Sequence, residues 1–469
     1  MSTDSDAGQR SAPPLVMSGV VPRLSMKAGL GPPRTECAAG AMMAFAERLW
    51  VVSYVSSKSQ SGVGTGLFEI DEDLRMTQRP ESYVGTYTNR MVHYPSNQLI
   101  IGPYVIDAER NVRTIEALLE VRLCGTMHHL KDPERKVYML GMEGEFFEMD
   151  VRTLKVKELA DLVKELGIPS VKRAHFKAGH SAYGRVVVAS NTYDNADFLG
   201  QADDGRLAEW DGTTWTVLER RPFVEVTGCG EFFGTIFATG WDNASAILEV
   251  FTQGDGKWRR YRLPKASHTF DHWWSTEWPR IRQTEHERFL MDCHGMFYEL
   301  CPWAYGNRVW GVRPISTHLW VMGDFCIFRG MLVLGPDNAS PIHQHNHLAG
   351  EPQSALWFGK TDDLWQFGKP AGWGGPWRET PVKAGQPSDP YLMTGFDGKC
   401  LHLAHRADRR VTFLVEVDFL GNGTWMPYER IEVPARGYDH HEFPAGFSAH
   451  WLRVTAQADC TATAYLVYT

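Results

Sequence analysis

Residues 288–300 read RFLMDCHGMFYEL, two short apolar segments joined by the turn residues Cys293-His294-Gly295. Short runs rich in Phe, Tyr and Leu on either side of a Gly-containing turn predict two antiparallel β-strands. The preceding residues 268–282, HTFDHWWSTEWPRIR, are dense in His, Trp and Arg. We therefore expect residues 268–300 to form one β-sheet unit that carries much of the chemistry of the chain.

The same pattern of strand, glycine turn and strand occurs seven times along the chain. The copies begin at Arg48, Gln98, Lys136, Arg185, Thr235, Arg288 and Met331. Their starts lie 38 to 53 residues apart, which leaves room for four strands in each copy. Seven such units predict an all-β fold, a seven-bladed β-propeller. A large β-sandwich or a β-helix is the alternative.

The repeats divide the chain into three parts. Residues 1–36 are predicted to be a flexible leader, residues 37–386 the propeller, and residues 387–469 a small β-sandwich-like appendage. Strand-like alternation continues through this last part, although the repeat has stopped. Only LKVKELADLVKELG, from Leu154, reads as a helix, of two to three turns.

Composition and charge exclude several classes of protein. A net charge of −8 and an isoelectric point near 6.1 argue against nucleic acid or an anionic membrane as the partner. No apolar run approaches the roughly 18 residues of a transmembrane helix. The first residues lack the basic and apolar regions of a signal peptide. Eight scattered cysteines without a CxxC pair predict reduced thiols. We expect a cytoplasmic protein, or a secreted one if a signal peptide has been removed.

The propeller fold predicts which residues share a face. The innermost strand of each blade lines a central channel. The loops that lead into these strands share one rim with the loops between the second and third strands, and loops on a rigid scaffold carry function. Most of the 18 histidines fall on this rim or in the channel. The candidate catalytic residues are His129, His175, His180 and Arg282. The candidate binding residues are Arg90, Asn191, Trp241, His268, Trp273, Glu277 and His294.

Each of these residues also has a purely structural interpretation. The tryptophans can pack between blades, a single histidine is commonly a hydrogen-bonded structural residue, and Arg280 and Arg282 can form ion pairs between blades. The sequence His343-Gln-His345-Asn-His347 would direct three imidazoles to one side of an extended chain. This run is a candidate site for a divalent cation, and the metal content of the protein stays open.

The absence of known motifs narrows the field. The sequence contains no P-loop, dinucleotide GxGxxG, GxSxG elbow, HExxH or kinase motif. It also lacks the WD40 Gly-His and Trp-Asp periodicity, the kelch double glycine and the repeated sialidase box.

The residue types on the rim suit a carbohydrate. Tryptophan faces stack on sugar rings, arginine binds a carboxylate through two hydrogen bonds, and histidine transfers protons near neutral pH. Together they favour a lyase that removes the C5 proton of a uronate and cleaves the glycosidic bond by β-elimination. A glycoside hydrolase that uses two of Asp242, Asp271 and Glu277 is one alternative. A non-enzymatic sugar- or protein-binding propeller is another.

In its architecture the chain resembles the seven-bladed propeller enzymes that act on carbohydrates. These are uronate-specific polysaccharide lyases, such as ulvan and rhamnosyl-glucuronate lyases, and related rhamnosidases. The resemblance covers residues 37–386. It implies that His129 and His175, on the third and fourth blades, belong to a catalytic set. Asn191 stands near the position of the family's arginine, which Arg282 or Arg90 would replace from across the channel. The implied partner is an oligo- or polysaccharide.

Overall fold

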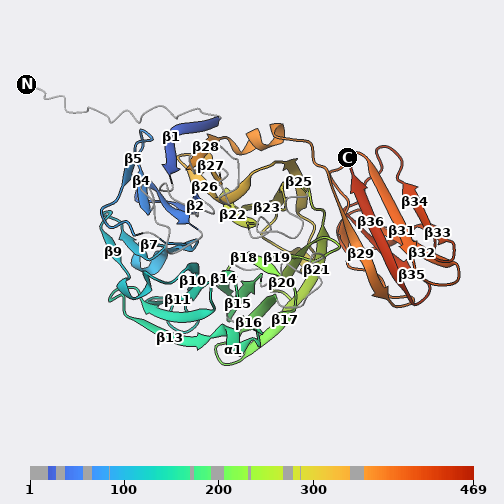
Figure 1. Cartoon of the computed structure of the whole chain (residues 1–469), viewed down its shortest axis with the longest axis horizontal. Coiled ribbons are helices and arrows are strands. Elements are labelled where there is room, and N and C mark those ends of the chain that lie inside the picture. The colour runs from blue at the N-terminus through green and yellow to red at the C-terminus, as the bar shows by residue number, and fades with distance from the viewer. Residues whose placement is uncertain are drawn as a thin grey trace, which may run out of the picture.

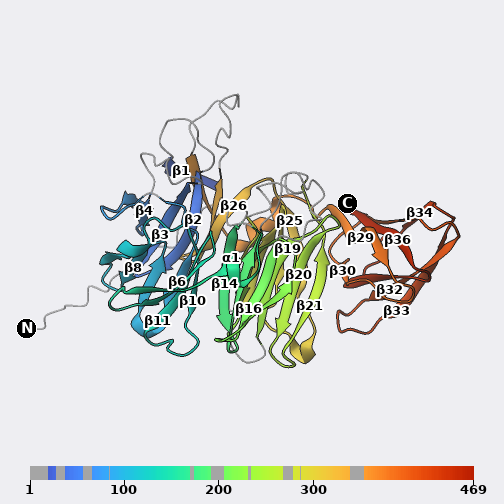
Figure 2. The same cartoon turned by 60° about the horizontal axis from the view of Figure 1, so that its bottom comes forward.

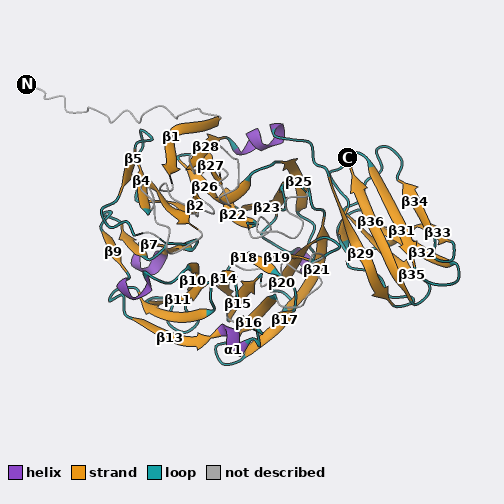
Figure 3. Cartoon of the chain, in the orientation of Figure 1, coloured by secondary structure: helices purple, strands orange, loops and turns teal. Residues whose placement is uncertain are grey.

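Seven blades of four antiparallel strands each form a closed ring in the computed structural model, and a β-sandwich lies beside the ring (Figure 1). The structure describes residues 19–27, 37–55, 66–83, 85–169, 174–191, 205–230, 234–267, 278–285, 287–337 and 353–469. Almost all regular structure in these ranges is β-strand (Figure 3). The prediction of an all-β, seven-bladed propeller with a C-terminal sandwich is confirmed.

The first three blades follow one another along the chain. Blade 1 contains β2 (Cys37–Phe45), β3 (Arg48–Val55), β4 (Leu67–Ile70) and β5 (Met76–Gln78). Blade 2 contains β6 (Arg90–His93), β7 (Gln98–Ile101), β8 (Tyr104–Asp107) and β9 (Val112–Thr114). Blade 3 contains β10 (Leu123–His128), β11 (Lys136–Gly141), β12 (Glu145–Asp150) and β13 (Val156–Asp161).

The next three blades repeat this order. Blade 4 contains β14 (Phe176–Ala182), β15 (Arg185–Ser190), β16 (Arg206–Trp210) and β17 (Trp215–Glu219). Blade 5 contains β18 (Phe223–Gly228), β19 (Thr235–Trp241), β20 (Ala246–Thr252) and β21 (Lys257–Leu263). Blade 6 contains β22 (Arg280–Glu285), β23 (Arg288–Cys293), β24 (Met296–Leu300) and β25 (Val312–Thr317).

Blade 7 closes the ring with strands from both ends of the propeller. It contains β26 (Val321–Phe328), β27 (Met331–Asp337) and β28 (Gln353–Gly359), and its outermost strand is β1 (Gly19–Lys27). β1 pairs antiparallel with β28, and the Leu24 side chain is fully buried. Residues 19–27 are therefore a structural strand. The prediction of a flexible leader is wrong for them, because β1 supplies the hydrogen bonds that the edge of β28 would otherwise lack.

The C-terminal sandwich consists of two four-stranded sheets. One contains β29 (Gly372–Val382), β36 (Cys460–Tyr468), β31 (Lys399–His405) and β34 (Tyr438–Glu442). The other contains β30 (Tyr391–Leu392), β35 (Trp451–Ala456), β32 (Val411–Asp418) and β33 (Met426–Val433). Because β29 pairs with β36, the sandwich begins at Gly372, before the predicted boundary at residue 387.

Helical structure in the described ranges is short. It consists of α1 (Leu162–Glu165) and the 3₁₀ turns η1 (Tyr94–Ser96), η2 (Glu116–Leu118), η6 (Tyr305–Asn307) and η7 (Thr361–Gln366). The helix predicted from Leu154 is wrong over most of its length, since residues 156–161 form the outer strand β13. Pairing with β12 outweighs the helical propensity of these residues. None of the helices in the described ranges is long and apolar enough to cross a membrane.

The sandwich is attached to blade 5. β21 pairs with β30 at Arg262 and Tyr391, which joins one sandwich sheet to the blade. Trp451 packs against Tyr261 with ring centroids 4.7 Å apart, and its indole N–H donates to the Val309 carbonyl at 3.1 Å. The apolar core is continuous across this contact. Figures 1 and 2 both place the sandwich at the side of the propeller, so it does not cover the central channel.

Candidate functional site

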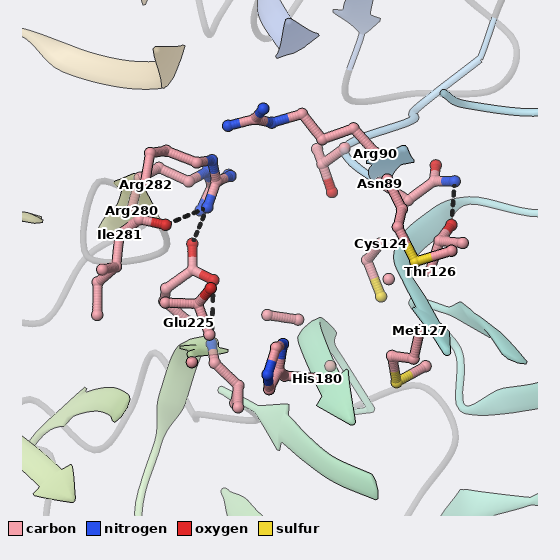
Figure 4. Close-up of a pocket in the computed structure, with 18 of the residues that line it drawn as sticks. Asn89, Arg90, Cys124, Thr126, Met127, His180, Glu225, Arg280, Ile281 and Arg282 are labelled. Atoms are coloured by element: carbon pink, nitrogen blue, oxygen red, sulfur yellow. Dashed lines mark hydrogen bonds and ion pairs between the residues drawn. The ribbon is translucent and has the colours of Figure 1, made fainter. Parts of the chain in front are cut away.

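The innermost strands of the blades surround a cavity of about 290 Å³ in the central channel. Strands β6, β10, β14, β18 and β22 supply most of its lining. Figure 4 shows side chains from these strands directed into the same space. Arg90, Arg280 and Arg282 lie in one part of this space, Asn89 lies beside Arg90, and Thr126 and Met127 continue the wall below Asn89.

Asp324 of β26 organises the arginine-rich part of the channel. Its side chain is completely buried, and its two oxygens lie 2.7 Å from Arg282 Nε and 2.9 Å from Arg90 Nε. The Met42 backbone N–H donates to the same carboxylate at 2.7 Å. These nearby positive charges and the N–H donor hold the pKa of Asp324 below its usual value despite its burial. Asp324 is therefore an ionised structural residue.

Arg282 is held from two sides. Besides Asp324, it binds Glu225 of β18, with Arg282 Nη1 2.9 Å from Glu225 Oε2 (Figure 4). The Glu225 side chain is only 5% exposed, and its other oxygen accepts from the Val226 backbone N–H at 3.1 Å. Burial opposes the charge of Arg282, but the two carboxylates outweigh it and raise the pKa of this arginine. The guanidinium is thus fixed in place and largely neutralised.

Arg280 is buried beside this network without a carboxylate of its own. It is 3% exposed, and its Nε and Nη1 atoms donate to the backbone carbonyls of Gly323 and Pro279 at 2.9 and 2.8 Å. Its guanidinium also lies 5.1 Å from the Trp278 ring centroid. Among the described residues, no carboxylate lies within ion-pair distance of Arg280. Burial lowers the pKa of Arg280, since carbonyl contacts compensate its charge only in part.

The channel therefore holds an excess of positive charge. Among the described residues of the cluster, the carboxylates Glu225 and Asp324 pair with Arg282 and Arg90, and Arg280 has no carboxylate partner. This local excess contrasts with the net charge of −8 of the whole chain. A buried charge without a partner costs several kcal/mol, so an anion in the cavity would be strongly favoured.

Two unpartnered polar atoms lie in the wall of the same cavity. Asn89 is 1% exposed, and its Nδ2 donates to Gly102 O and Thr126 Oγ1, but its Oδ1 has no hydrogen-bond partner among the described residues. His180 Nε2 is likewise buried and unpartnered there. Burial and the neighbouring His128 lower the pKa of His180 to about 4, so its imidazole is neutral at physiological pH.

Two glycines keep the cavity open where β10 and β14 approach each other. A Cβ atom on Gly125 would lie 3.2 Å from the backbone nitrogen of Gly179, and a Cβ on Gly179 would lie 2.6 Å from Met127 Sδ. Larger residues at these positions would push the strands apart or displace the Met127 side chain from the cavity lining.

The thiol of Cys124, which also lines the cavity, is not activated as a nucleophile. Burial raises the pKa of this thiol, so it stays protonated.

The predicted site residues divide into three groups, and only one of these groups lines the cavity. Arg90, His180 and Arg282 do so. His129 does not: its Nε2 lies 2.8 Å from Glu148 Oε2, and its Nδ1 accepts from the backbone N–H groups of Lys131 and Asp132. It organises the turn between β10 and β11 and is not part of the cavity lining.

The second group lies at the ends of strands and does not line the cavity. His294 is 1% exposed and has φ 51°, followed by Gly295 with φ 84°, as a tight hairpin turn between β23 and β24 requires. Trp241, at the end of β19, packs edge-on against it with centroids 6.0 Å apart. Asn191 follows β15, is fully buried and donates its backbone N–H to the His175 carbonyl at 3.0 Å. The candidates His175, Asn191, Trp241 and His294 therefore do not line the cavity.

The third group, His268, Trp273 and Glu277, lies outside the described residues. The same holds for Asp271 and for the candidate metal ligands His343, His345 and His347. Within the described part of the chain, no group of three or more His, Cys, Asp or Glu side chains is placed to hold a metal ion.

The sequence-based list missed Arg280, Glu225 and Asn89. Arg280 could have been found, because it stands two residues before Arg282 and side chains alternate along a strand. Glu225 carried no comparable signal, since its partner Arg282 is 57 residues away in the chain. Asn89 directly precedes the candidate Arg90.

Comparisons with known proteins are consistent with a propeller and show no family. No protein-family model and no curated protein matches the chain. Similar solved structures include the WD40 repeats of RRP9, with a TM-score of 0.43 at 8% identity over 74% of this chain and 99% of that one. The WD40 propeller of Doa1 gives 0.41 at 8% identity over 73% and 99%. A luciferin-regenerating enzyme gives 0.40 at 6% identity over 73% and 94%.

The prediction of a uronate lyase is wrong. The similar structures include WD40 propeller domains, and none of the three named above is a polysaccharide lyase. The geometry agrees, because His129 is engaged by Glu148 outside the cavity and Arg282 is already bound by two carboxylates. The prediction of an oligo- or polysaccharide partner is wrong for the same reason. For the hydrolase alternative, the candidate carboxylate Asp242 is engaged in an ion pair, with its Oδ2 atom 2.9 Å from Arg262 Nη1.

Proposed function

We propose that the chain is a non-enzymatic, protein-interaction propeller whose central channel binds a carboxylate of its partner. The observation that carries the proposal is Arg280. A guanidinium that is 3% exposed and has no carboxylate within ion-pair distance among the described residues needs an anion to complete its environment. A planar carboxylate matches the two-pronged donor geometry of arginine.

The surroundings of Arg280 favour binding over catalysis. The neighbouring carboxylates Glu225 and Asp324 are both committed to Arg282. The Cys124 thiol is held protonated by burial, and His180 is neutral with a pKa of about 4. A general base works best when its pKa lies near the working pH and a nucleophile needs activation, and these groups have neither property.

Thermal unfolding in the presence of succinate tests the proposal. A ligand that binds only the folded state stabilises it by mass action, so succinate should raise the unfolding midpoint of the wild-type protein. Arg280→Gln should lose at least three quarters of that increase. The matched control is Arg409→Gln, because Arg409 is exposed and forms no ion pair among the described residues. Equal stabilisation of all three proteins would overturn the proposal, as would no stabilisation of the wild type.

A further inference from the structure

We infer that the carboxylate is the C-terminal α-carboxylate of a partner chain that enters the channel in an extended conformation. This inference rests on the proposed function and makes the partner specific. It follows from three features of the cavity, namely its volume, its excess positive charge and the two unpartnered acceptor atoms in its wall.

The volume excludes a folded element. A cavity of about 290 Å³ lies at the lower end of the range for small-ligand sites, roughly 300–1,000 Å³. An α-helix with its side chains is about 10–12 Å wide and cannot enter such a space. An extended chain needs only about 3.3–3.6 Å of length per residue, so the last two or so residues of a chain fit.

The charges fix which end of the chain enters. Arg280 has no ion-pair partner among the described residues, and Arg90 shares Asp324 with Arg282. An N-terminal ammonium group would add a positive charge to this excess and would be repelled. A C-terminal carboxylate supplies the missing negative charge and is positioned for hydrogen bonds from arginine.

Two polar atoms in the rest of the wall complement the peptide backbone. Asn89 Oδ1 is an unpartnered acceptor, and a neutral histidine with one unpartnered ring nitrogen, here His180 Nε2, can accept a hydrogen bond. A chain end presents backbone N–H donors within one or two residues of its carboxylate. A single extended end therefore supplies both the anion for the arginines and the donors for Asn89 and His180. A small dicarboxylate supplies only the anion.

Three peptides of similar size distinguish a C-terminal carboxylate from the side-chain carboxylate of a glutamate within a chain. The first is acetyl-Ala-Ala-Ala with a free C-terminus, the second is the same peptide as its C-terminal amide, and the third is acetyl-Ala-Glu-Ala amide. Calorimetric titration should give the free acid an affinity at least tenfold higher than that of either amide. Arg280→Gln should remove this preference.

The outcomes distinguish the inference from the proposed function. Equal, Arg280-dependent binding of the free acid and the mid-chain Glu peptide would overturn the inference and leave the proposed function standing. Succinate that binds as tightly as the free-acid peptide would also overturn the inference, because it would indicate a small-molecule source. Binding of the free acid that is unchanged in Arg280→Gln would overturn both.

Variants of His180 test the backbone contact separately. His180→Phe removes the acceptor, and should weaken the free-acid peptide about three- to tenfold while leaving succinate affinity unchanged. His180→Gln restores an acceptor and should recover most of the loss. A His180→Phe protein that binds the peptide as tightly as wild type would contradict the role of this residue and, with it, the inferred backbone contact.

Discussion

Asp324 Oδ1 lies 2.7 Å from Arg282 Nε, and this ion pair, in which Asp324 is fully buried, joins the inner strands of the neighbouring blades 6 and 7. Asp324 also lies 2.9 Å from Arg90 of blade 2 and accepts from the Met42 backbone N–H of blade 1, and these contacts form only when the ring closes. Asp324 thus connects the closure of the propeller to the electrostatics of its channel.

Removal of Asp324 should strongly destabilise the fold. Asp324→Asn leaves Arg282 with one carboxylate and Arg90 with none, and breaking a buried ion pair costs about 3–5 kcal/mol. Urea unfolding followed by tryptophan fluorescence measures the loss. Glu432→Gln is the control, because the pair between Glu432 and Arg410 is mostly exposed and should contribute little. A loss below about 1 kcal/mol for Asp324→Asn would contradict the central role of this carboxylate.

Removal of Arg280 should have the opposite effect on stability. Its charge is buried without an ion pair, and replacing such a charge with an apolar side chain of similar volume is neutral or stabilising by about 1–4 kcal/mol. Arg280→Met keeps the packing against Trp278 and removes the charge. Its free energy of unfolding without ligand should equal or exceed that of the wild type in the same urea experiment. A drop of more than about 1 kcal/mol would show that Arg280 is satisfied within the free protein.

Removal of Glu225 should strengthen anion binding. Glu225 competes with any ligand for Arg282, to which it is bound at 2.9 Å. Glu225→Gln keeps the shape of the side chain and releases part of the positive charge of the arginine. The affinity for succinate, measured by calorimetry, should rise severalfold, whereas Glu432→Gln should leave it unchanged. An unchanged or weaker affinity in Glu225→Gln would place the anion away from Arg282.

The junction between blade 5 and the sandwich should make stability depend on pH. Burial and the nearby charge of Asp389 raise the pKa of Glu249 to about 8 from its ordinary value of 4.5. Arg260, which lies 2.8 Å from Glu249, does not reverse this shift because it also contacts Glu219 and lies near Asp389.

The direction of the pH effect follows from proton linkage. The folded state retains a proton on Glu249 that the unfolded state releases above about pH 4.5. The stability that this proton supports is present at low pH and is lost as the pH rises from 4.5 through 8. Glu249→Gln carries no titrating group there, so its stability relative to the wild type should increase over that interval in urea unfolding. A constant difference between the two proteins from pH 5 to 8.5 would contradict the raised pKa.

The fold could be predicted because each blade repeats a local signal. The strand-turn-strand pattern that begins at Arg288 forms β23 and β24, and the copy that begins at Lys136 forms β11 and β12. This pattern consists of alternating apolar and polar residues and of turn residues, and both can be recognised from a few neighbouring positions in the sequence. Where local preference and pairing disagree, pairing decides, as residues 156–161 show by forming a strand in a helix-like sequence.

The site could be predicted only in part, because it depends on contacts around the ring. The pairs Asp324–Arg282 and Arg282–Glu225 join positions that are 42 and 57 residues apart. Nothing in the local sequence distinguishes these side chains from surface ions. For the same reason the sequence analysis assigned catalytic or binding roles to histidines that stabilise turns. His129 and His294 lie in turns whose geometry is seen only in the structure.

The affinity of the free-acid peptide acetyl-Ala-Ala-Ala for the wild-type protein and for Arg280→Gln tests the account most directly. Calorimetric titration at low ionic strength limits the screening of the channel charge. If the carboxylate binds beside the unpaired guanidinium, the substitution should weaken binding at least tenfold, and Arg409→Gln should not change it. Equal affinities for the wild type and Arg280→Gln would contradict the account.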